Sequence, residues 1–248
     1  MLANSSTAIG CHDRFNMNAK ARMNTSTLPP VVQGAVYGVV LNDRRSLAKL
    51  GDALVQPPYK GAPQAPVLYI KPANTLSGSG ASVVLPAGAG RLEIGATLGV
   101  VIGAPAARLS LESAASAIAG YVVVADLSLP HTSYYRPAIR EKCFDGSCPM
   151  SPAIVPAGLV GDPGRLRVDT CVNGAEVDSW PLGDLLRSVP ELLRDVSEFM
   201  TLRVGDMLLV GVPWQAPEAV AGDEVRVVVA GVGEVGFRVV ANESGVAA

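Results

Sequence analysis

The chain has 248 residues, of which 49% are hydrophobic and only 17% are charged, against about 25% charged residues in an ordinary soluble domain. Its 20 Lys and Arg and 22 Asp and Glu give a net charge of −2, which supplies no electrostatic reason to bind nucleic acid or an anionic membrane. Two histidines and four cysteines are too few for a metal framework built from several imidazole or thiolate ligands.

The first thirty residues are polar and contain no apolar segment of the kind found in a secretory signal. We therefore expect a flexible tail over residues 1–30 and a single domain over residues 31–248. No apolar stretch reaches the roughly 18–20 residues that a membrane-spanning helix needs. These features predict a cytoplasmic protein whose thiols stay reduced.

Short, valine-rich apolar runs separated by glycine and proline favour strands in the first part of this domain. The predicted strands are residues 34–41, 67–70, 82–85, 92–102 and 121–125. A short helix is predicted over residues 111–119, because Ser110 is a good N-cap, Glu112 lies in the first turn and Gly120 follows the last turn.

The second part is predicted to contain a hairpin and a longer helix. Apolar and polar residues alternate over 166–172, and the following Asn173-Gly174 is a strong hairpin signal, so residues 175–180 should form the return strand. Ser188 and Glu191 form a capping-box pattern ahead of apolar residues at helical spacing. The last predicted strands, which complete a β-rich α+β domain with a few short helices, are residues 207–210, 225–230 and 235–240.

A first cluster that could carry chemistry begins at Lys71, at the end of a predicted strand. The residues that follow include Asn74, Ser77, Gly78 and Gly80. Glycines let backbone amides approach an anion, and a neighbouring lysine can polarise an oxyanion. The alternative is an ordinary tight turn that carries a surface lysine.

A second cluster, residues 126–145, follows the strand that ends at Asp126. Its polar members include His131, Tyr134, Tyr135, Arg136, Arg140, Lys142 and Asp145. Arginine can bind a carboxylate through two hydrogen bonds, so one interpretation is a site for a carboxylate-bearing ligand. The other is a solvated loop in which Asp126 caps a helix.

Two cysteines and one further segment give weaker indications of a chemical role. Cys143 and Cys148 lack His or Cys partners at ligand spacing, so we expect reduced, partly buried thiols. The segment 205–213 is interpreted as a turn, a strand and a tight loop at the edge of a hairpin.

Several motifs occur in a fixed order along the chain. They are Tyr69-Ile-Lys-Pro-Ala-Asn-Thr75, Gly95-Ala-Thr-Leu-Gly-Val-Val-Ile-Gly103, Ala119-Gly-Tyr-Val-Val-Val-Ala-Asp126, Lys142-Cys-Phe-Asp145, Phe199-Met-Thr-Leu-Arg-Val-Gly-Asp206 and Gly211-Val-Pro213. Together they resemble the fumarylacetoacetate hydrolase superfamily, whose members act on β-diketo and 2-oxo acids with a divalent metal. The resemblance implies a mixed β-sandwich or β-roll of that family's type.

Two more motifs resemble one branch of the family. They are Ser128-Leu-Pro-His-Thr-Ser-Tyr-Tyr-Arg-Pro-Ala-Ile-Arg140 and Asp145-Gly-Ser-Cys-Pro149. The branch comprises bifunctional isomerases/decarboxylases of 4-hydroxyphenylacetate (homoprotocatechuate) degradation, and the motifs look like the N-terminal half of its two-repeat members. The resemblance implies decarboxylation of 5-oxopent-3-ene-1,2,5-tricarboxylate and isomerisation of 2-hydroxyhepta-2,4-dienedioate.

The resemblance also implies a Mg²⁺ or Mn²⁺ site, but this sequence departs from its pattern. The family's two glutamate ligands fall on Gly95 and Thr97, and only the aspartate ligand is retained, as Asp126. Such a cation usually needs one or two carboxylates and a strict geometry, so we expect Asp126 alone to bind it poorly. Glu93, two residues before Gly95, is a substitute ligand or, alternatively, a structural residue.

The family's general-base positions are also changed. The His and Glu of its Asn-Tyr-x-x-His-x-x-Glu stretch fall here on Ser46 and Lys49, and serine without a partner base accepts protons poorly. The family's Gly-Thr-Pro becomes Gly211-Val-Pro213, which removes a hydroxyl group.

The retained groups are mostly those that handle anions. The resemblance implies that Lys71 and Lys142 stabilise an enolate oxygen. It implies a substrate-binding role for the remaining candidates, which are Asn74, Tyr135, Arg136, Arg140 and Asp145.

Three functional interpretations stay open. The first is an active subunit of the isomerase/decarboxylase. The second is a metal-poor structural or regulatory partner of a paralogous active subunit. The third is a module that binds a 2-oxo acid without chemistry. A homodimer or a heteromer with a paralogous subunit is expected from the family.

Overall fold

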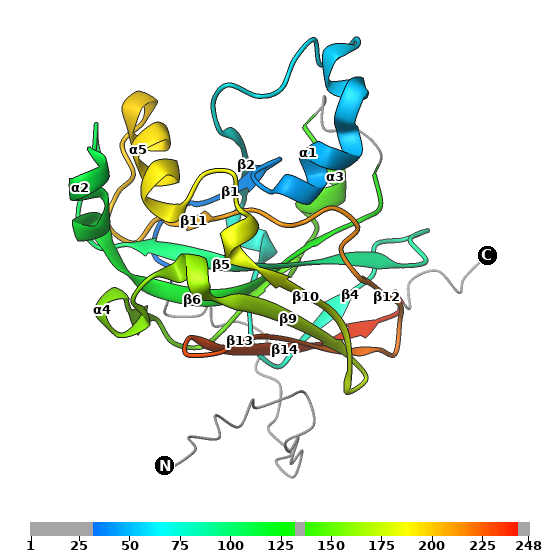
Figure 1. Ribbon diagram of the computed structural model, residues 1–248. Helices are drawn as coiled ribbons and strands as arrows, with labels where there is room; N and C mark the ends of the chain where they lie inside the picture. The colour runs from blue at the N-terminus through cyan, green and yellow to red at the C-terminus, as the bar shows by residue number, and fades with distance from the viewer. Residues whose placement is uncertain (1–31, 132–136, 243–248) are drawn as a thin grey trace, which may run out of the picture.

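The computed structural model describes residues 32–131 and 137–242, and within them the strands form two sheets around a shared core (Figure 1). In these residues the larger sheet has nine strands. Its main path runs β2 (Val67–Lys71), β1 (Val36–Val40), β11 (Met207–Leu209), β5 (Leu92–Ile102), β6 (Ile118–Ser128), β7 (Cys148–Met150) and β3 (Leu76–Gly78), with β12 (Glu218–Ala219) on β5 and β8 (Val155–Pro156) on β6. The predicted fold class is confirmed.

The antiparallel ladder between β5 and β6 forms the centre of the larger sheet. Both strands have eleven residues and are buried along almost their whole length. Val123 and Leu127 pack toward the smaller sheet, whereas Val122 and Val124 pack on the opposite face with Met150. Because both faces are covered, these strands have continuous apolar runs instead of an alternating pattern.

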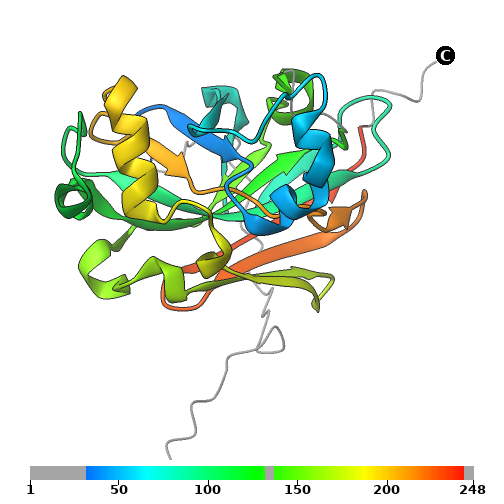
Figure 2. The same cartoon turned by 45° about the horizontal axis from the view of Figure 1, so that its top comes forward.

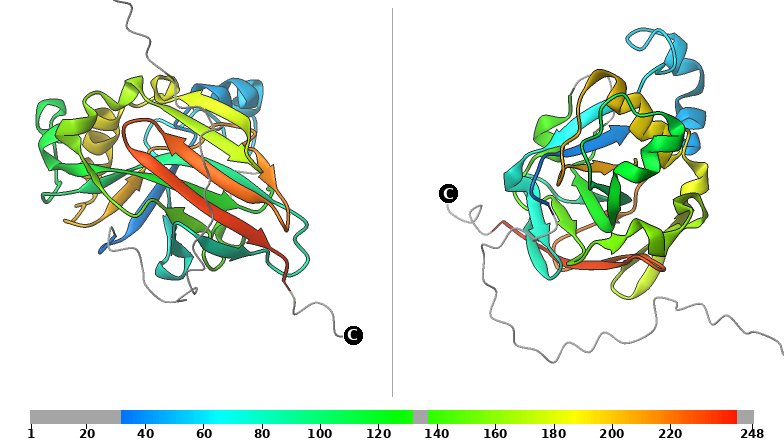
Figure 3. Two further views of the ribbon diagram at one scale, coloured as in Figure 1. Left: turned by 90° about the horizontal axis from the view of Figure 1, so that it is seen from below. Right: turned by 90° about the vertical axis from the view of Figure 1, so that its left-hand side faces the viewer.

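The smaller sheet lies beneath β5 and β6 and is nearest the viewer on the left of Figure 3. Within the described residues its five strands, in order, are β10 (Ala175–Pro181), β9 (Arg167–Val172), β13 (Glu224–Val229), β14 (Gly233–Val240) and β4 (Ala81–Val84). The predicted hairpin is confirmed: Asn173 and Gly174 join β9 to β10 with φ angles of 51° and 83°. Alternate residues of β13 are buried because one face of this sheet covers the core.

The helices are short. They are α1 (Arg44–Leu50), α2 (Leu111–Ala114), α3 (Ile139–Lys142), α4 (Ala157–Val160) and α5 (Val189–Phe199), with 3₁₀ turns at Gly51–Val55, Ala73–Thr75, Ala115–Ala117, Pro163–Arg165 and Leu182–Asp184. Helices α1 and α5 lie above β5 and β6 in the view of Figure 1. The buried residues of α5 pack into the same core cluster as those of the smaller sheet, whereas Figure 2 shows the helices from the top.

Two predicted helices had different outcomes. Helix α5 begins where predicted, and the Glu191 carboxylate accepts hydrogen bonds from the amide and hydroxyl of Ser188. The helix predicted over residues 111–119 ends at Ala114, although Ser110 does cap it. The chain turns into β6 at Ile118 because that residue pairs with Ile102 of β5.

The segment 205–213 was wrongly interpreted as a hairpin edge. Strand β11 lies inside the larger sheet, parallel to β1 and antiparallel to β5. The carboxylate of Asp206 is structural: it accepts hydrogen bonds from the amides of Ala35 and Arg203. The partner strands are more than 100 residues away in sequence, so local patterns could not reveal this position.

The predicted tail over residues 1–30 lies outside the described residues. No helix in the described part of the chain combines the length and the hydropathy that crossing a membrane would require.

Asn42, two residues after the end of β1, links its own segment to two others and provides a test of the fold. Its buried side chain donates to the carbonyls of Val210 and Arg187 and accepts from the Arg187 amide. We predict that Asn42→Ala lowers the free energy of unfolding by about 2–3 kcal/mol, because it leaves buried backbone groups unpaired. Urea unfolding checks this, with Gln64→Ala as an exposed amide control that should change stability by less than about 0.5 kcal/mol. Equal losses in both variants would contradict the assignment.

Candidate functional site

A fully buried carboxylate lies between two lysine ammonium groups at the centre of the candidate site. Asp126 Oδ1 is 3.0 Å from Lys71 Nζ, and Asp126 Oδ2 is 2.9 Å from Lys142 Nζ. The hydroxyl of Tyr69 also donates to Oδ2. Asp126 belongs to β6, Tyr69 and Lys71 to β2, and Lys142 to the end of α3. We call these four residues the lysine–aspartate cluster.

Strand geometry explains how β2 supplies two members of the cluster. Tyr69 and Lys71 are two residues apart on one strand, so their side chains lie on the same face. Tyr69 is opposite Gly38 of β1, and a Cβ atom at position 38 would overlap the tyrosine ring. Glycine therefore lets the ring lie close over β1. The Lys142 ammonium group is 4.7 Å from the centre of that ring, a favourable cation–π position.

Lys71 anchors the main chain around the cluster. Its Nζ lies 2.5 Å from the Lys142 carbonyl, 3.1 Å from both the carbonyl and the hydroxyl oxygen of Ser147, and 3.3 Å from the Leu127 carbonyl. An ammonium group has only three protons to donate. These four acceptors explain why Asp126 Oδ1 has a Coulombic contact with Lys71 but no hydrogen-bond partner.

Charges and burial within the cluster shift the pKa values of Asp126 and Tyr69 in opposite directions. Burial alone would raise the pKa of Asp126, but Lys142, Lys71 and the Tyr69 hydrogen bond outweigh it and hold this pKa well below its ordinary value. Burial and the nearby Asp126 charge raise the pKa of Tyr69 well above its ordinary value. Two ammonium groups and one carboxylate therefore leave a formal charge of +1 beside the pocket.

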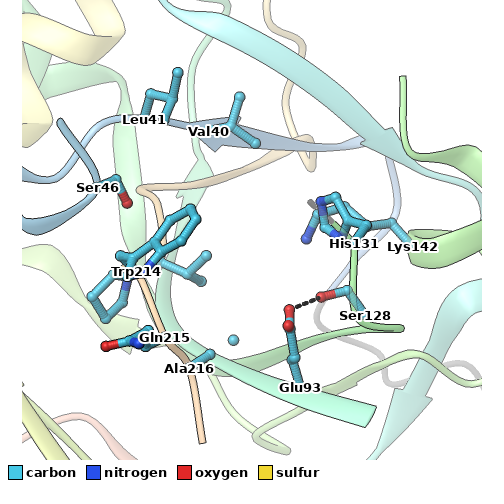
Figure 4. A pocket seen from close by; sticks show the side chains of 13 residues that line it. Val40, Leu41, Ser46, Glu93, Ser128, His131, Lys142, Trp214, Gln215 and Ala216 are labelled. Atoms are coloured by element: carbon cyan, nitrogen blue, oxygen red, sulfur yellow. Dashed lines mark hydrogen bonds between the residues drawn. The ribbon is translucent and has the colours of Figure 1, made fainter. Parts of the chain in front are cut away.

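A pocket of about 120 Å³ opens beside the cluster. Figure 4 shows Lys142 and His131 on one side, Ser46 and Trp214 on the other, and Glu93 at the base. The other lining residues are Val40, Leu41, Gly95, Ser128, Val212, Pro213, Gln215 and Ala216. Lys142 lines this pocket, whereas the fully buried Lys71 is not among the lining residues.

Glu93 supplies the carboxylate in this lining. Its Oε2 lies 3.4 Å from the Ser128 hydroxyl, and burial raises the pKa of Glu93. In the β5–β6 ladder Glu93 is opposite Ser128, whereas Asp126 is opposite Gly95. The two carboxylates are thus offset by two residues along the strands, or about 7 Å.

The residues present do not fit a divalent cation. Thr97 is buried, and its hydroxyl donates to the Gly211 carbonyl at 2.6 Å. A Cβ atom at Gly95 would overlap the main-chain oxygen of Asp126, so no larger ligand residue fits there without movement of the strands. Both carboxylate oxygens of Asp126 already face ammonium groups. Within residues 32–131 and 137–242, no three His, Cys, Asp or Glu side chains gather closely enough to hold a metal ion.

Ser46 and Lys49, the two changed general-base positions, lie in different surroundings. Ser46 lines the pocket, and its amide donates to Asp43, the N-cap of α1. Lys49 is exposed on the same helix and is not among the lining residues.

Three of the five predicted substrate-binding residues lie in the described part of the chain, and all three are exposed. Asn74 donates to Asp145 Oδ1 at 2.7 Å and to the Cys143 carbonyl at 3.1 Å, so this exposed pair joins the 3₁₀ turn after β2 to the segment after α3. Arg140 is exposed on α3. None of these residues lines the pocket, and Tyr135 and Arg136 lie outside the described residues; their substrate-binding roles stay predictions.

Two other expectations from the sequence have clear outcomes. Asp126 does not cap a helix, because β6 continues to Ser128 and buries the carboxylate completely. Cys143 and Cys148 are free thiols, as predicted, and burial raises the pKa of Cys148 to about 12.

Sequence reasoning gave no role to Tyr69 or Trp214. Tyr69 was detectable, because it lies two residues before Lys71 on the same face of a predicted strand. Trp214 had no comparable signal, because its place in the pocket depends on how the loop after β11 crosses the sheet.

The ion pairs of Asp126 predict a specific dependence of stability on pH. The folded-state pKa lies below the ordinary value of 3.8, so the stabilisation is complete above that value and is lost as the pH falls below it. We predict that Asp126→Asn lowers the free energy of unfolding at pH 7 by about 3–5 kcal/mol, because two buried ammonium groups lose their counterion. Denaturant unfolding should show the difference from wild type narrowing below about pH 4. A constant difference would contradict this explanation.

The close approach at Gly38 predicts a second effect. Gly38→Ala should lower the free energy of unfolding by about 1–3 kcal/mol, because the new methyl group displaces the Tyr69 ring. Gly78→Ala is the control, since a Cβ atom at that strand position meets nothing within 4 Å. In a Tyr69→Ala background the cost of Gly38→Ala should fall toward that of the control. Additive costs would show that the ring is not what Gly38 accommodates.

The comparisons with known proteins agree with this architecture. The family model for the C-terminal part of fumarylacetoacetate (FAA) hydrolase matches residues 35–240. A 4-hydroxyphenylacetate degradation bifunctional isomerase/decarboxylase from Escherichia coli is 40% identical over 200 residues, which are 81% of this chain and 46% of that protein. The chain thus spans about half the length of such relatives.

Two solved structures share the fold. A 5-carboxymethyl-2-hydroxymuconate delta-isomerase from Mycobacterium smegmatis has a TM-score of 0.73 and 29% identity, over 87% of this chain and 82% of that one. A fumarylpyruvate hydrolase from Pseudomonas aeruginosa, in complex with Mn²⁺ and pyruvate, has a TM-score of 0.73 and 26% identity, over 84% of this chain and 90% of that one. The matched family model and the 40% identity show that the chain belongs to the fumarylacetoacetate hydrolase family.

Proposed function

We propose that this chain is a subunit of a decarboxylase/isomerase of aromatic catabolism that acts on 2-oxo acids with several carboxylates. The observation that carries the proposal is the Lys142 ammonium group, which lines the pocket and belongs to a cluster of net charge +1. Such a group complements a carboxylate or an enolate oxygen. The similarity to an isomerase/decarboxylase and to an isomerase supports this class of reaction.

The proposed reactions are those of the resembling branch. The first is loss of CO₂ from 5-oxopent-3-ene-1,2,5-tricarboxylate, and the second is tautomerisation of the 2-hydroxyhepta-2,4-dienedioate product. When the bond to the departing carboxylate breaks, its electron pair moves toward the 2-oxo group. Lys142 donates a hydrogen bond to the resulting enolate oxygen and lowers the energy of the charge that develops there.

The other members of the cluster have positioning roles. Asp126 and the Tyr69 ring hold the Lys142 ammonium group in place. Lys71 fixes the main-chain carbonyl of Lys142 and also the Ser147 segment, without lining the pocket. This arrangement supports a role for Lys142 in contacting the substrate and a role for Lys71 in positioning Lys142.

His131 and Glu93 are placed to move protons during the tautomerisation. Both line the pocket, and the Leu129 carbonyl lies 3.1 Å from His131 Nδ1. A carbonyl can only accept, so it favours the proton on Nδ1 and makes Nε2 the basic nitrogen. Burial raises the pKa of Glu93, which favours its use as an acid.

A second candidate function rests on Gly95 and Thr97, which remove two ligand positions of the family. In that alternative the chain is a structural or regulatory partner of a paralogous subunit with both glutamates, or it binds a 2-oxo acid without turnover. A homodimer or such a heteromer, located in the cytoplasm, is proposed with either function.

Turnover of the tricarboxylate by the purified chain tests the proposal. We predict decarboxylation and loss of dienol absorbance, and we expect Lys142→Met to reduce kcat/KM by about 10²-fold or more. Lys60→Met, at an exposed lysine outside the pocket, should retain wild-type activity. No turnover alone, with turnover restored by a co-expressed paralogue that carries the Glu-x-Glu pair, would support the partner function instead.

A further inference from the structure

We propose that this pocket binds the anionic oxygens of a 2-oxo acid on the Lys142 ammonium group without a divalent cation. The identity of the ligand rests on the proposed function, whereas the absence of a cation requirement rests on the side chains around Asp126. The inference gives the lysine–aspartate cluster the electrostatic role for which relatives such as the Mn²⁺ and pyruvate complex contain a metal.

The space for further carboxylate ligands is filled. At Gly95, a Cβ atom would overlap the Asp126 carbonyl oxygen and would lie 3.0 Å from Cγ1 of Val212. The Thr97 side chain is directed to the Gly211 carbonyl. Main chain and an apolar side chain therefore occupy the region into which ligands from β5 would project, and the nearby Gly211-Val-Pro213 loop adds no hydroxyl.

Positive charge is already present where the remaining carboxylate lies. One oxygen of Asp126 faces Lys71 and the other faces Lys142, both within 3.0 Å. A dication at either oxygen would have to displace an ammonium group or lie beside one and be repelled by it. Displacing either ammonium group would break other contacts, because Lys71 contacts four further oxygens and Lys142 packs over the Tyr69 ring.

The charge balance of the cluster suits an anionic ligand. Lys71, Lys142 and Asp126 sum to +1, so one carboxylate or enolate of the ligand neutralises the cluster. Burial raises the pKa of the Glu93 carboxyl in the pocket lining, which disfavours a competing negative charge there. The Lys142 side chain is 7% exposed, and it is the member of the cluster that lines the pocket. Its ammonium group can therefore meet the ligand while Asp126 stays behind it.

Glu93 supplies the remaining carboxylate that could bind a cation. It lies in the pocket lining, and its Oε2 lies 3.4 Å from the hydroxyl of Ser128. Both carboxylate oxygens of Asp126 already face ammonium groups, which leaves a cation at Glu93 with a single available carboxylate. Glu93→Gln consequently distinguishes a cation site from an ammonium site.

Two measurements on the full chain test the inference. After EDTA treatment, electron paramagnetic resonance of added Mn²⁺ should show the spectrum of free Mn²⁺ only. Isothermal titration calorimetry with 2-oxoglutarate should give the same Kd, within twofold, in EDTA and in excess Mn²⁺. Lys142→Met should weaken binding at least tenfold, Lys142→Arg should restore part of it, and Lys60→Met should leave it within threefold of wild type.

The outcomes separate this inference from the proposed function. Mn²⁺ that binds the wild type and is lost in Glu93→Gln or Asp126→Asn, or binding of 2-oxoglutarate that requires Mn²⁺, overturns the inference and leaves the proposed function standing. Metal-independent binding without turnover of the tricarboxylate supports the inference and overturns the catalytic function. No binding in either buffer overturns both.

Discussion

The burial of one carboxylate between two ammonium groups constrains much of this molecule. Asp126 is inaccessible to solvent, so its charge depends on Lys71 from β2 and Lys142 from α3. Those contacts fix where the edge strand β2 and the segment after β6 lie relative to the central ladder. The hydrogen bonds from Lys71 to the Lys142, Ser147 and Leu127 carbonyls extend the same constraint to the main chain. A pocket wall with a positioned ammonium group follows from this packing.

Close approach of backbones makes the cluster possible and also limits its chemistry. Gly38 lets the Tyr69 ring lie over β1, where it supports Lys142 and donates to Asp126. Gly95 lets β5 approach Asp126 so closely that no ligand side chain fits between them. The same absence of a Cβ atom thus favours an ammonium-based site at one position and disfavours a metal site at the other. We therefore propose that lysine supplies the electrostatic stabilisation in this member of the family.

Local patterns predicted many of the elements well. The bounds of β5 agree with the predicted strand at 92–102, and the Asn173-Gly174 turn and the start of α5 also agree, because each depends on neighbouring residues. The prediction was wrong for the end of α2 and for the position of β11. In both cases pairing with a strand distant in sequence overrode the local pattern. The family resemblance drew attention to Lys71, Asp126 and Lys142, but it did not show what each one contacts.

The sequence by itself determined the β-rich composition, the turn and cap positions, and the loss of two carboxylates at Gly95 and Thr97. Only the tertiary structure decided that Asp126 is an ion-pair partner instead of an open ligand, because its contacts join residues 16 and 57 positions apart in the chain. The tertiary structure also distinguished the two lysines, because Lys142 lines the pocket and Lys71 does not. Side-chain identity sets the charges that are present, whereas burial and distance set which of them can meet a ligand.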